Sequence, residues 1–157
     1  MKLERRKCIS LAFWLALTIA VGAAIFLFSS QTAAQSNEVS KSTLRWILQL
    51  LGKSTDELLR RYNHYLRKLA HFGLYALFGF CLTGTLRHEN RVPKLPAAVG
   101  FGAVFAALDE FHQHFVEGRG PQVSDVLLDT AGVFTGALVM TLILLFLNRV
   151  RMRRATA

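Results

Sequence analysis

Ionisable and hydrogen-bonding side chains recur at helical spacing in three stretches of this 157-residue chain. In the first stretch, Lys68, His71 and Tyr75 are spaced i, i+3 and i+7, so they share one face of a helix. Groups of this kind can form ion pairs, bind a polar ligand or exchange protons with it. The other two stretches contain pairs spaced i, i+4, namely Asp109 with Gln113, Glu110 with His114, and Asp125 with Asp129.

The segment between the second and third stretches has turn chemistry and adds a cation. Gly118-Arg119-Gly120-Pro121 is rich in turn-forming residues, and Ser124 is well placed to cap the helix that follows. We therefore expect one polar cluster to be assembled from three helices and this turn. The candidate ligand-binding residues are Lys68, His71, Tyr75, Asp109, Glu110, Gln113, Arg119, Ser124, Asp125 and Asp129.

The elements that would position this cluster are long and apolar. Residues 8–28, 69–86 and 130–148 are runs of 21, 18 and 19 residues without Asp, Glu, Lys or Arg. A bilayer core of about 30 Å takes roughly 20 helical residues, so these runs have spanning lengths. The chain is 52% hydrophobic, which excludes disorder, and the three runs exclude a soluble domain.

We predict an all-α fold, a single membrane domain over residues 1–157 that forms an integral four-helix bundle. The expected spanning helices are 8–28, 67–86, 95–115 and 125–148. The first run resembles a secretory signal because four bases precede it and small residues follow it. Its 21 residues exceed the 7–15 of a signal h-region, so a retained helix is favoured over a cleaved signal.

The connection between the first two spanning helices is predicted to contain an amphipathic helix lying in the membrane interface. Leu44, Ile47, Leu48 and Leu51 recur at helical spacing and the pattern ends at Gly52. A capping box, Ser54 to Glu57, would then start the second spanning helix. The connection is either a lid that packs on the bundle or a flap that faces lipid or ligand.

The formal net charge of +9 first suggests a nucleic-acid binder, but its distribution argues for membrane topology. In the four-helix arrangement, the side with both termini and residues 87–94 carries eleven bases and two acids. The other side carries eight bases and eight acids. Because bases favour the cytoplasmic side, both termini are expected there, next to anionic lipid, and no nucleic-acid partner is expected.

The third apolar segment is too short to cross a bilayer. Residues 95–108 are 14 residues that rise about 21 Å, so Asp109 and Glu110 are expected within the outer part of the membrane. Acids there must face the bundle or have partners, and Lys68, His71 and Arg119 are available. The cluster is thus either a charge-paired plug that fixes helix packing or a binding site for a polar ligand.

Small residues predict close helix packing. Gly132 and Gly136 have the small-xxx-small spacing that allows two helices to approach closely, and Gly102 thins the third segment in the same way.

The order of these motifs resembles the VanZ-like membrane protein family over nearly the whole chain. The resemblance implies a four-helix integral membrane protein of the bacterial plasma membrane. The family's founding member is associated with low-level resistance to teicoplanin. One departure is Gly120-Pro121-Gln122, which lengthens or stiffens the turn after Arg119. The matching pieces are Phe28-Ser29-Ser30-Gln31, Lys68-Leu69-Ala70-His71-Phe72 with Tyr75, Ala107-Leu108-Asp109-Glu110-Phe111-His112-Gln113 with Arg119, and Ser124-Asp125-Val126 with Asp129-Thr130-Ala131-Gly132 and Gly136.

Three functions remain open at this stage. The first is binding of an amphiphile, such as a lipid-linked wall precursor or teicoplanin, to modulate the envelope. The second is an intramembrane hydrolase or transferase in which His71, Glu110 and His114 supply metal ligands or acid–base groups. The third is a proton path, although little polar continues inward from Tyr75. We favour binding over catalysis and expect no catalytic residue, metal or cofactor.

Overall fold

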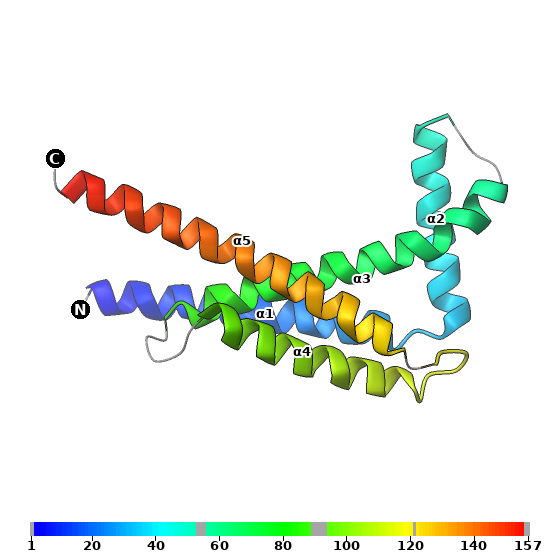
Figure 1. The fold of residues 1–157 in the computed structure, drawn as a ribbon, viewed down its shortest axis with the longest axis horizontal. Coiled ribbons are helices and arrows are strands. Elements are labelled where there is room, and N and C mark those ends of the chain that lie inside the picture. Colours follow the sequence, from blue (N-terminus) through cyan, green and yellow to red (C-terminus); the bar gives the residue numbers. More distant parts are fainter. Residues whose placement is uncertain (1, 53–55, 89–93, 121, 156–157) are drawn as a thin grey trace.

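The computed structural model describes residues 2–52, 56–88, 94–120 and 122–155, and over these ranges it contains five α-helices and no strand. Four of the helices run along the long axis of the molecule and α2 lies across one end, while the chain termini lie at the other end (Figure 1). The helices are α1 (Lys2–Ser29), α2 (Ala33–Leu50), α3 (Asp56–Leu86), α4 (Lys94–Gln113) and α5 (Val123–Ala155).

Three of these helices are long and apolar enough to cross a membrane. The candidate spans are Lys7–Ser29 in α1, Glu57–Leu86 in α3 and Val123–Arg154 in α5. Only 11%, 33% and 28% of the residues in their most apolar windows are buried inside the protein. Most of their apolar side chains therefore face outward, as they do in helices surrounded by lipid.

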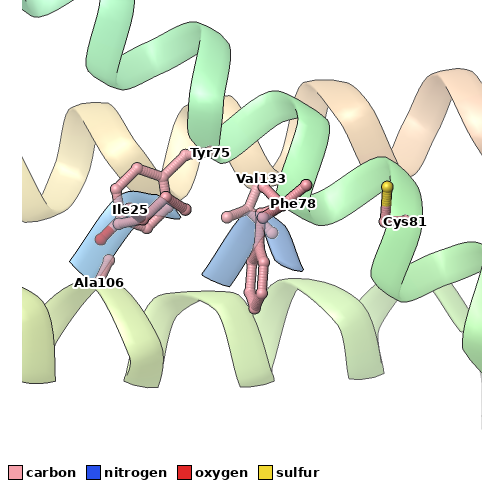
Figure 2. Close-up of a cluster of buried hydrophobic side chains, with 7 residues drawn as sticks. Ile25, Tyr75, Phe78, Cys81, Ala106 and Val133 are labelled. Atoms are coloured by element: carbon pink, nitrogen blue, oxygen red, sulfur yellow. The ribbon is translucent and has the colours of Figure 1, made fainter. Parts of the chain in front are cut away.

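The core lies where α1, α3, α4 and α5 meet. Tyr75 and Phe78 of α3 point toward Ile25 of α1, Ala106 of α4 and Val133 of α5 (Figure 2). Tyr75, Ala106 and Val133 are at most 1% exposed. This apolar layer joins α1, α3, α4 and α5.

Helix α1 is an integral part of this packing. Ile25 is 2% exposed, and the Thr18 and Thr85 hydroxyls lie 3.0 Å apart across the α1–α3 contact. Arg87, just after α3, donates to the Ser10 hydroxyl. These contacts pack α1 against α3.

Glycines bring α5 against α3, as the sequence predicted. A Cβ built on Gly132 would lie 2.6 Å from the Phe72 carbonyl oxygen, and one on Gly136 would enter the backbone of Ala76. The α3–α5 contact is the most extensive between any two helices. Gly102 of α4 accommodates Val133 of α5 in the same way. These close contacts fix the positions of α3, α4 and α5 relative to one another beneath the polar cluster.

Helix α2 is longer than the short helix expected around residues 44–51. It starts after Thr32, whose hydroxyl accepts from the Gln35 backbone N–H while the Gln35 side chain accepts from Thr32 N–H. This start was not predicted from the sequence, because residues 35–43 contain a single apolar residue, Val39, and so show no apolar period. Gly52 follows the helix with φ +67, the left-handed conformation of a helix end. The predicted cap at Ser54 lies outside the described residues.

The buried face of α2 also differs from the predicted stripe. It consists of Ser36, Ser40, Leu44 and Leu48, and the two leucines pack against Leu59 of α3. Leu51 is 65% exposed, so it does not belong to that face.

Candidate functional site

Three cross-helix contacts lie one turn apart at the end of the bundle nearest α2. Lys68 Nζ lies 2.7 Å from Asp125 Oδ1, and His71 Nδ1 lies 3.9 Å from Asp129 Oδ2. One turn deeper, the Tyr75 hydroxyl donates to Asp109 Oδ2 at 3.1 Å. The predicted face of α3 thus contacts α5 twice and α4 once.

Asp109 is the centre of a buried hydrogen-bond chain. Gln113, one turn further along α4, donates its Nε2 to Asp109 Oδ2 at 3.2 Å. Gln113 Oε1, the side-chain amide oxygen, then accepts from Arg119 Nη1 at 2.9 Å. Arg119 therefore reaches the cluster in spite of the lengthened turn that follows it. Burial, and after it the charge of Arg67, lowers the pKa of the Arg119 guanidinium, which still leaves it a cation.

Glu110 of α4 holds the turn before α5 in place through a hydrogen bond. Its Oε1 accepts from the Gln122 backbone N–H at 2.6 Å, while its side chain stays buried on α4. A carboxylate that receives a backbone N–H in this way fixes the position of the segment that supplies it.

Of the two alternatives for Asp109 and Glu110, the structure shows burial against the bundle, since both are at most 6% exposed. Among the described residues, the ion pairs of this cluster join Lys68 to Asp125 and His71 to Asp129. The two α4 acids are instead held by neutral donors, because the cations of α3 face α5.

The proposed cap at Ser124 is wrong. Helix α5 begins at Val123, which places Ser124 inside its first turn. Its exposed hydroxyl lies 3.3 Å from Asp125 Oδ1 and 3.5 Å from Gln122 Oε1. Ser124 is therefore at the edge of the cluster.

The cluster surrounds a cavity of about 120 Å³, which we call the polar cavity. Tyr75 and Asp109 lie beneath it, whereas seven of the ten predicted residues line it. Its side chains differ in exposure, from 4% for Asp129 to about a third for Lys68 and Asp125. The lining residues are Ala33, Arg67, Lys68, His71, Glu110, Gln113, Gly118, Arg119, Gly120, Gln122, Asp125, Leu128 and Asp129.

Three buried polar atoms of the cluster have no hydrogen-bond partner among the described residues. They are Asp109 Oδ1, Asp129 Oδ1 and Arg119 Nη2. Unpaired buried donors and acceptors are costly in a folded protein, and they are found where a site binds something polar. The set offers both acceptors and a cationic donor to a ligand.

A second hollow lies beside the polar cavity, between α2 and α3. This apolar groove has a volume of about 180 Å³ and a mostly apolar wall. Arg67 and His71, one helical turn apart, line both the polar cavity and the apolar groove. The groove is lined by Phe28, Gln31, Ser36, Val39, Ser40, Thr43, Leu66, Arg67, Ala70, His71 and Leu74.

Sequence reasoning missed Arg67 and Gln122 as site residues. Arg67 is spaced i, i+4 from His71, so the same helical rule could have found it. Gln122 acts through its backbone N–H, for which the sequence carries no signal.

A metal site is not formed by the residues considered for one. Within the described part of the chain, no three His, Cys, Asp or Glu side chains group as metal ligands. His114 is exposed, and its ring packs edge-on against Phe115.

Long helices with outward-facing apolar side chains and a polar cavity at one end define this molecule as an integral membrane protein of helical type. The chain belongs to the VanZ/LLP1 family, whose sequence profile matches residues 13–146. The match extends from α1 into α5 and includes every candidate site residue. No curated protein and no solved structure matches the chain.

Proposed function

We propose that this protein binds an amphiphile at the outer surface of the bacterial plasma membrane. The polar head would occupy the polar cavity and an apolar chain would lie in the apolar groove. One observation carries the proposal, namely that Arg67 and His71 line both hollows. A ligand with a charged head joined to an apolar chain matches such a pair of adjoining spaces.

The chemistry of the cavity indicates the head that it would accept. Arg67, Lys68 and Arg119 supply cationic donors for phosphate or carboxylate groups, and Arg119 Nη2 has no partner among the described residues. Asp125 and Asp129 supply acceptors for hydroxyl, amide or amine groups. Lipid-linked wall precursors and teicoplanin both combine such groups with an apolar chain. The expected result of binding is a change in glycopeptide susceptibility.

The membrane placement that goes with this proposal has four spanning helices and both termini in the cytoplasm. Helix α4 is the fourth span, and it enters the bilayer with its acids turned toward the bundle. The rise from Lys68 to Arg87 along α3 is about 29 Å, close to the thickness of a bilayer core. The termini lie at one end of the bundle (Figure 1), which supports this topology.

In this placement α2 lies in the interface as a lid over the site. Its first backbone N–H, from Ala33, donates to the Glu117 carbonyl at 3.2 Å, which ties it to the turn after α4. Its other end packs on Leu59 through Leu44 and Leu48. Trp46 on α2 and Leu51 directly after the helix are exposed, as expected for a helix in contact with headgroups. These contacts favour a packed lid over a free flap.

The proposal can be tested by closing the groove while leaving the charges intact. Ala70 is exposed on the groove wall, so Ala70→Phe would obstruct the space for a chain. Leu69→Phe is the matched control, because Leu69 is 65% exposed and lies outside both hollows.

We would express wild type and both variants in a susceptible Gram-positive host, quantify membrane abundance, and measure teicoplanin and vancomycin susceptibility. A shift selective for teicoplanin that is lost with Ala70→Phe and kept with Leu69→Phe supports the proposal. Equal loss with both variants at equal abundance contradicts it. Asp109→Asn, tested in parallel, reports on the hydrogen-bond chain beneath the cavity.

A second candidate function, intramembrane hydrolysis or group transfer on a lipid-linked substrate, is favoured by the His71–Asp129 pair. An imidazole 3.9 Å from a buried carboxylate and facing a cavity can act as a general base toward water. Turnover of a lipid-linked substrate by purified protein, lost in His71→Gln, would establish this function. Stoichiometric binding without turnover would leave the binding function.

A further inference from the structure

A third cavity lies at the opposite end of the bundle from the polar cavity. It has a volume of about 460 Å³ and opens where α3 ends, α4 begins and the last third of α5 passes. Its polar lining combines bases with the neutral Thr141 and Asn148, and within the described residues it includes no carboxylate. We call it the basic cavity, and it is lined by Arg87, His88, Lys94, Thr141, Leu144, Leu145, Leu147, Asn148 and Arg151.

Arg87 is held in place at the rim of this cavity. Its guanidinium donates to the Ser10 hydroxyl and lies 5.6 Å from the centre of the Trp14 ring. Its Nε also donates to His88 Nε2 at 3.1 Å. An arginine fixed by three neighbours retains little side-chain entropy to lose when an anion binds to it.

The other wall of the cavity is apolar. Leu144, Leu145 and Leu147 of α5 lie below Asn148 and Arg151 on the same helix, and Leu145 is 53% exposed. The space therefore has bases at its outer end and leucines toward the membrane interior. That order matches the order of phosphate and acyl chain in a phospholipid.

We propose that the basic cavity binds the phosphate of an anionic phospholipid, with an acyl chain against the leucines of α5. Lys94 and Arg151 approach the phosphate from α4 and α5, and Arg87 closes the third side. Bases near an anionic membrane surface each contribute attraction that falls off within about a Debye length. The leucine wall selects a lipid phosphate over a free one.

The depth of the cavity agrees with this assignment. Arg87 lies about 29 Å along α3 from Lys68, so the two cavities are one bilayer core apart. The basic cavity is then at the headgroup level of the other leaflet, where Trp14 beside Arg87 is also typical. This site is independent of the amphiphile site, since the two share no residue.

The test removes two of the bases and compares the result with an equal loss of charge elsewhere on the same end. The test variant is Lys94→Gln with Arg151→Gln. The control is Arg149→Gln with Arg154→Gln, two exposed residues of α5 that do not line the cavity. Purified full-length protein in neutral detergent would be titrated with dioleoyl phosphatidylglycerol, dioleoyl phosphatidylcholine or inorganic phosphate, and bound lipid counted by native mass spectrometry.

We expect phosphatidylglycerol to bind to wild type and to the control with affinities within about twofold, and to the test variant roughly tenfold more weakly. Circular dichroism of each variant checks that the helices are retained. Three results would overturn the proposal. They are equal weakening in test and control variants, binding of phosphatidylcholine as tight as that of phosphatidylglycerol, and displacement of the lipid by an equal concentration of inorganic phosphate.

Discussion

The Tyr75 hydroxyl donates a hydrogen bond of 3.1 Å to Asp109 Oδ2 and joins α3 to α4 beneath the polar cavity. Tyr75 is 0% exposed and Asp109 is 4% exposed, so neither group can exchange this partner for water. Asp109 Oδ2 also accepts from Gln113 Nε2, so the two donors together fix the position of this carboxyl group. The contact therefore couples helix packing to the geometry of the site above it.

Tyr75→Phe is expected to lower the free energy of unfolding by about 0.5–1.5 kcal/mol, the usual net contribution of one intramolecular hydrogen bond. Chemical denaturation of the purified protein in detergent would measure this change in the free energy of unfolding. Tyr65→Phe is the control, because Tyr65 is 66% exposed and its change should be close to zero. Equal effects of the two substitutions would mean that the Tyr75–Asp109 bond adds nothing to stability.

The Lys68–Asp125 ion pair is expected to contribute little to stability despite its 2.7 Å length. Both side chains are about a third exposed, and exposed pairs usually couple by about 0.2–1 kcal/mol. A double-mutant cycle with Lys68→Ala and Asp125→Ala would give the coupling energy. The coupling energy of the more exposed Lys41–Glu38 pair on α2, which is 3.5 Å apart, would be measured in the same way for comparison. A coupling above about 3 kcal/mol would mean that the pair is desolvated.

Gly136→Ala is expected to reduce the yield of folded protein sharply, because the added methyl group would enter the backbone of Ala76. Gly100→Ala is the matched control, since a Cβ there meets nothing within 4 Å. Alanine should even stabilise α4 at that position by about 1 kcal/mol. Monodisperse yield after detergent extraction would be compared, and equal yields would contradict the close α3–α5 contact.

His88 is expected to titrate below its ordinary value of 6.5, because burial, and after it the charges of Arg87 and Lys7, lowers its pKa. Since the folded pKa lies below the unfolded one, the folded state binds fewer protons, and stability falls as the pH drops from 6.5 through the folded pKa. Nuclear magnetic resonance of the His88 ring would follow the titration. Arg87→Gln should raise the pKa toward 6.5, and anionic lipid in the basic cavity should raise it too. An unchanged His88 pKa in Arg87→Gln would show that the charge of Arg87 does not lower it.

The helices could be predicted from the chain because their hydrophobic signal is local. The spacing of apolar residues gives α1, α3 and α5, and the spacing of Gly132 and Gly136 gives the face by which α5 packs. Helix α2 was found only in part. Its first half is polar, and its buried face includes Ser36 and Ser40, which hydropathy places at the surface.

The members of the site could be predicted better than their partners. Helical spacing placed Lys68, His71 and Tyr75 on one face. It could not give the rotation of α3 relative to α4 and α5, which decides whether Lys68 faces Asp125 or Asp109. The sequence left two alternatives for the α4 acids, which were burial against the bundle or partners among Lys68, His71 and Arg119. The fold satisfies those acids with Tyr75, Gln113 and a backbone N–H, which no count of charges reveals.

The apolar layer of Tyr75, Phe78, Phe105 and Val133 has an electrical consequence. The Phe78 and Phe105 rings stack 4.8 Å apart directly below the hydrogen-bond chain of Asp109. From Tyr75 to Arg87, α3 rises only about 18 Å, against about 30 Å for a bilayer core. In the membrane placement proposed above, the apolar barrier inside the bundle would be thinner than the surrounding bilayer core, and a transmembrane voltage would fall mainly across that shorter distance.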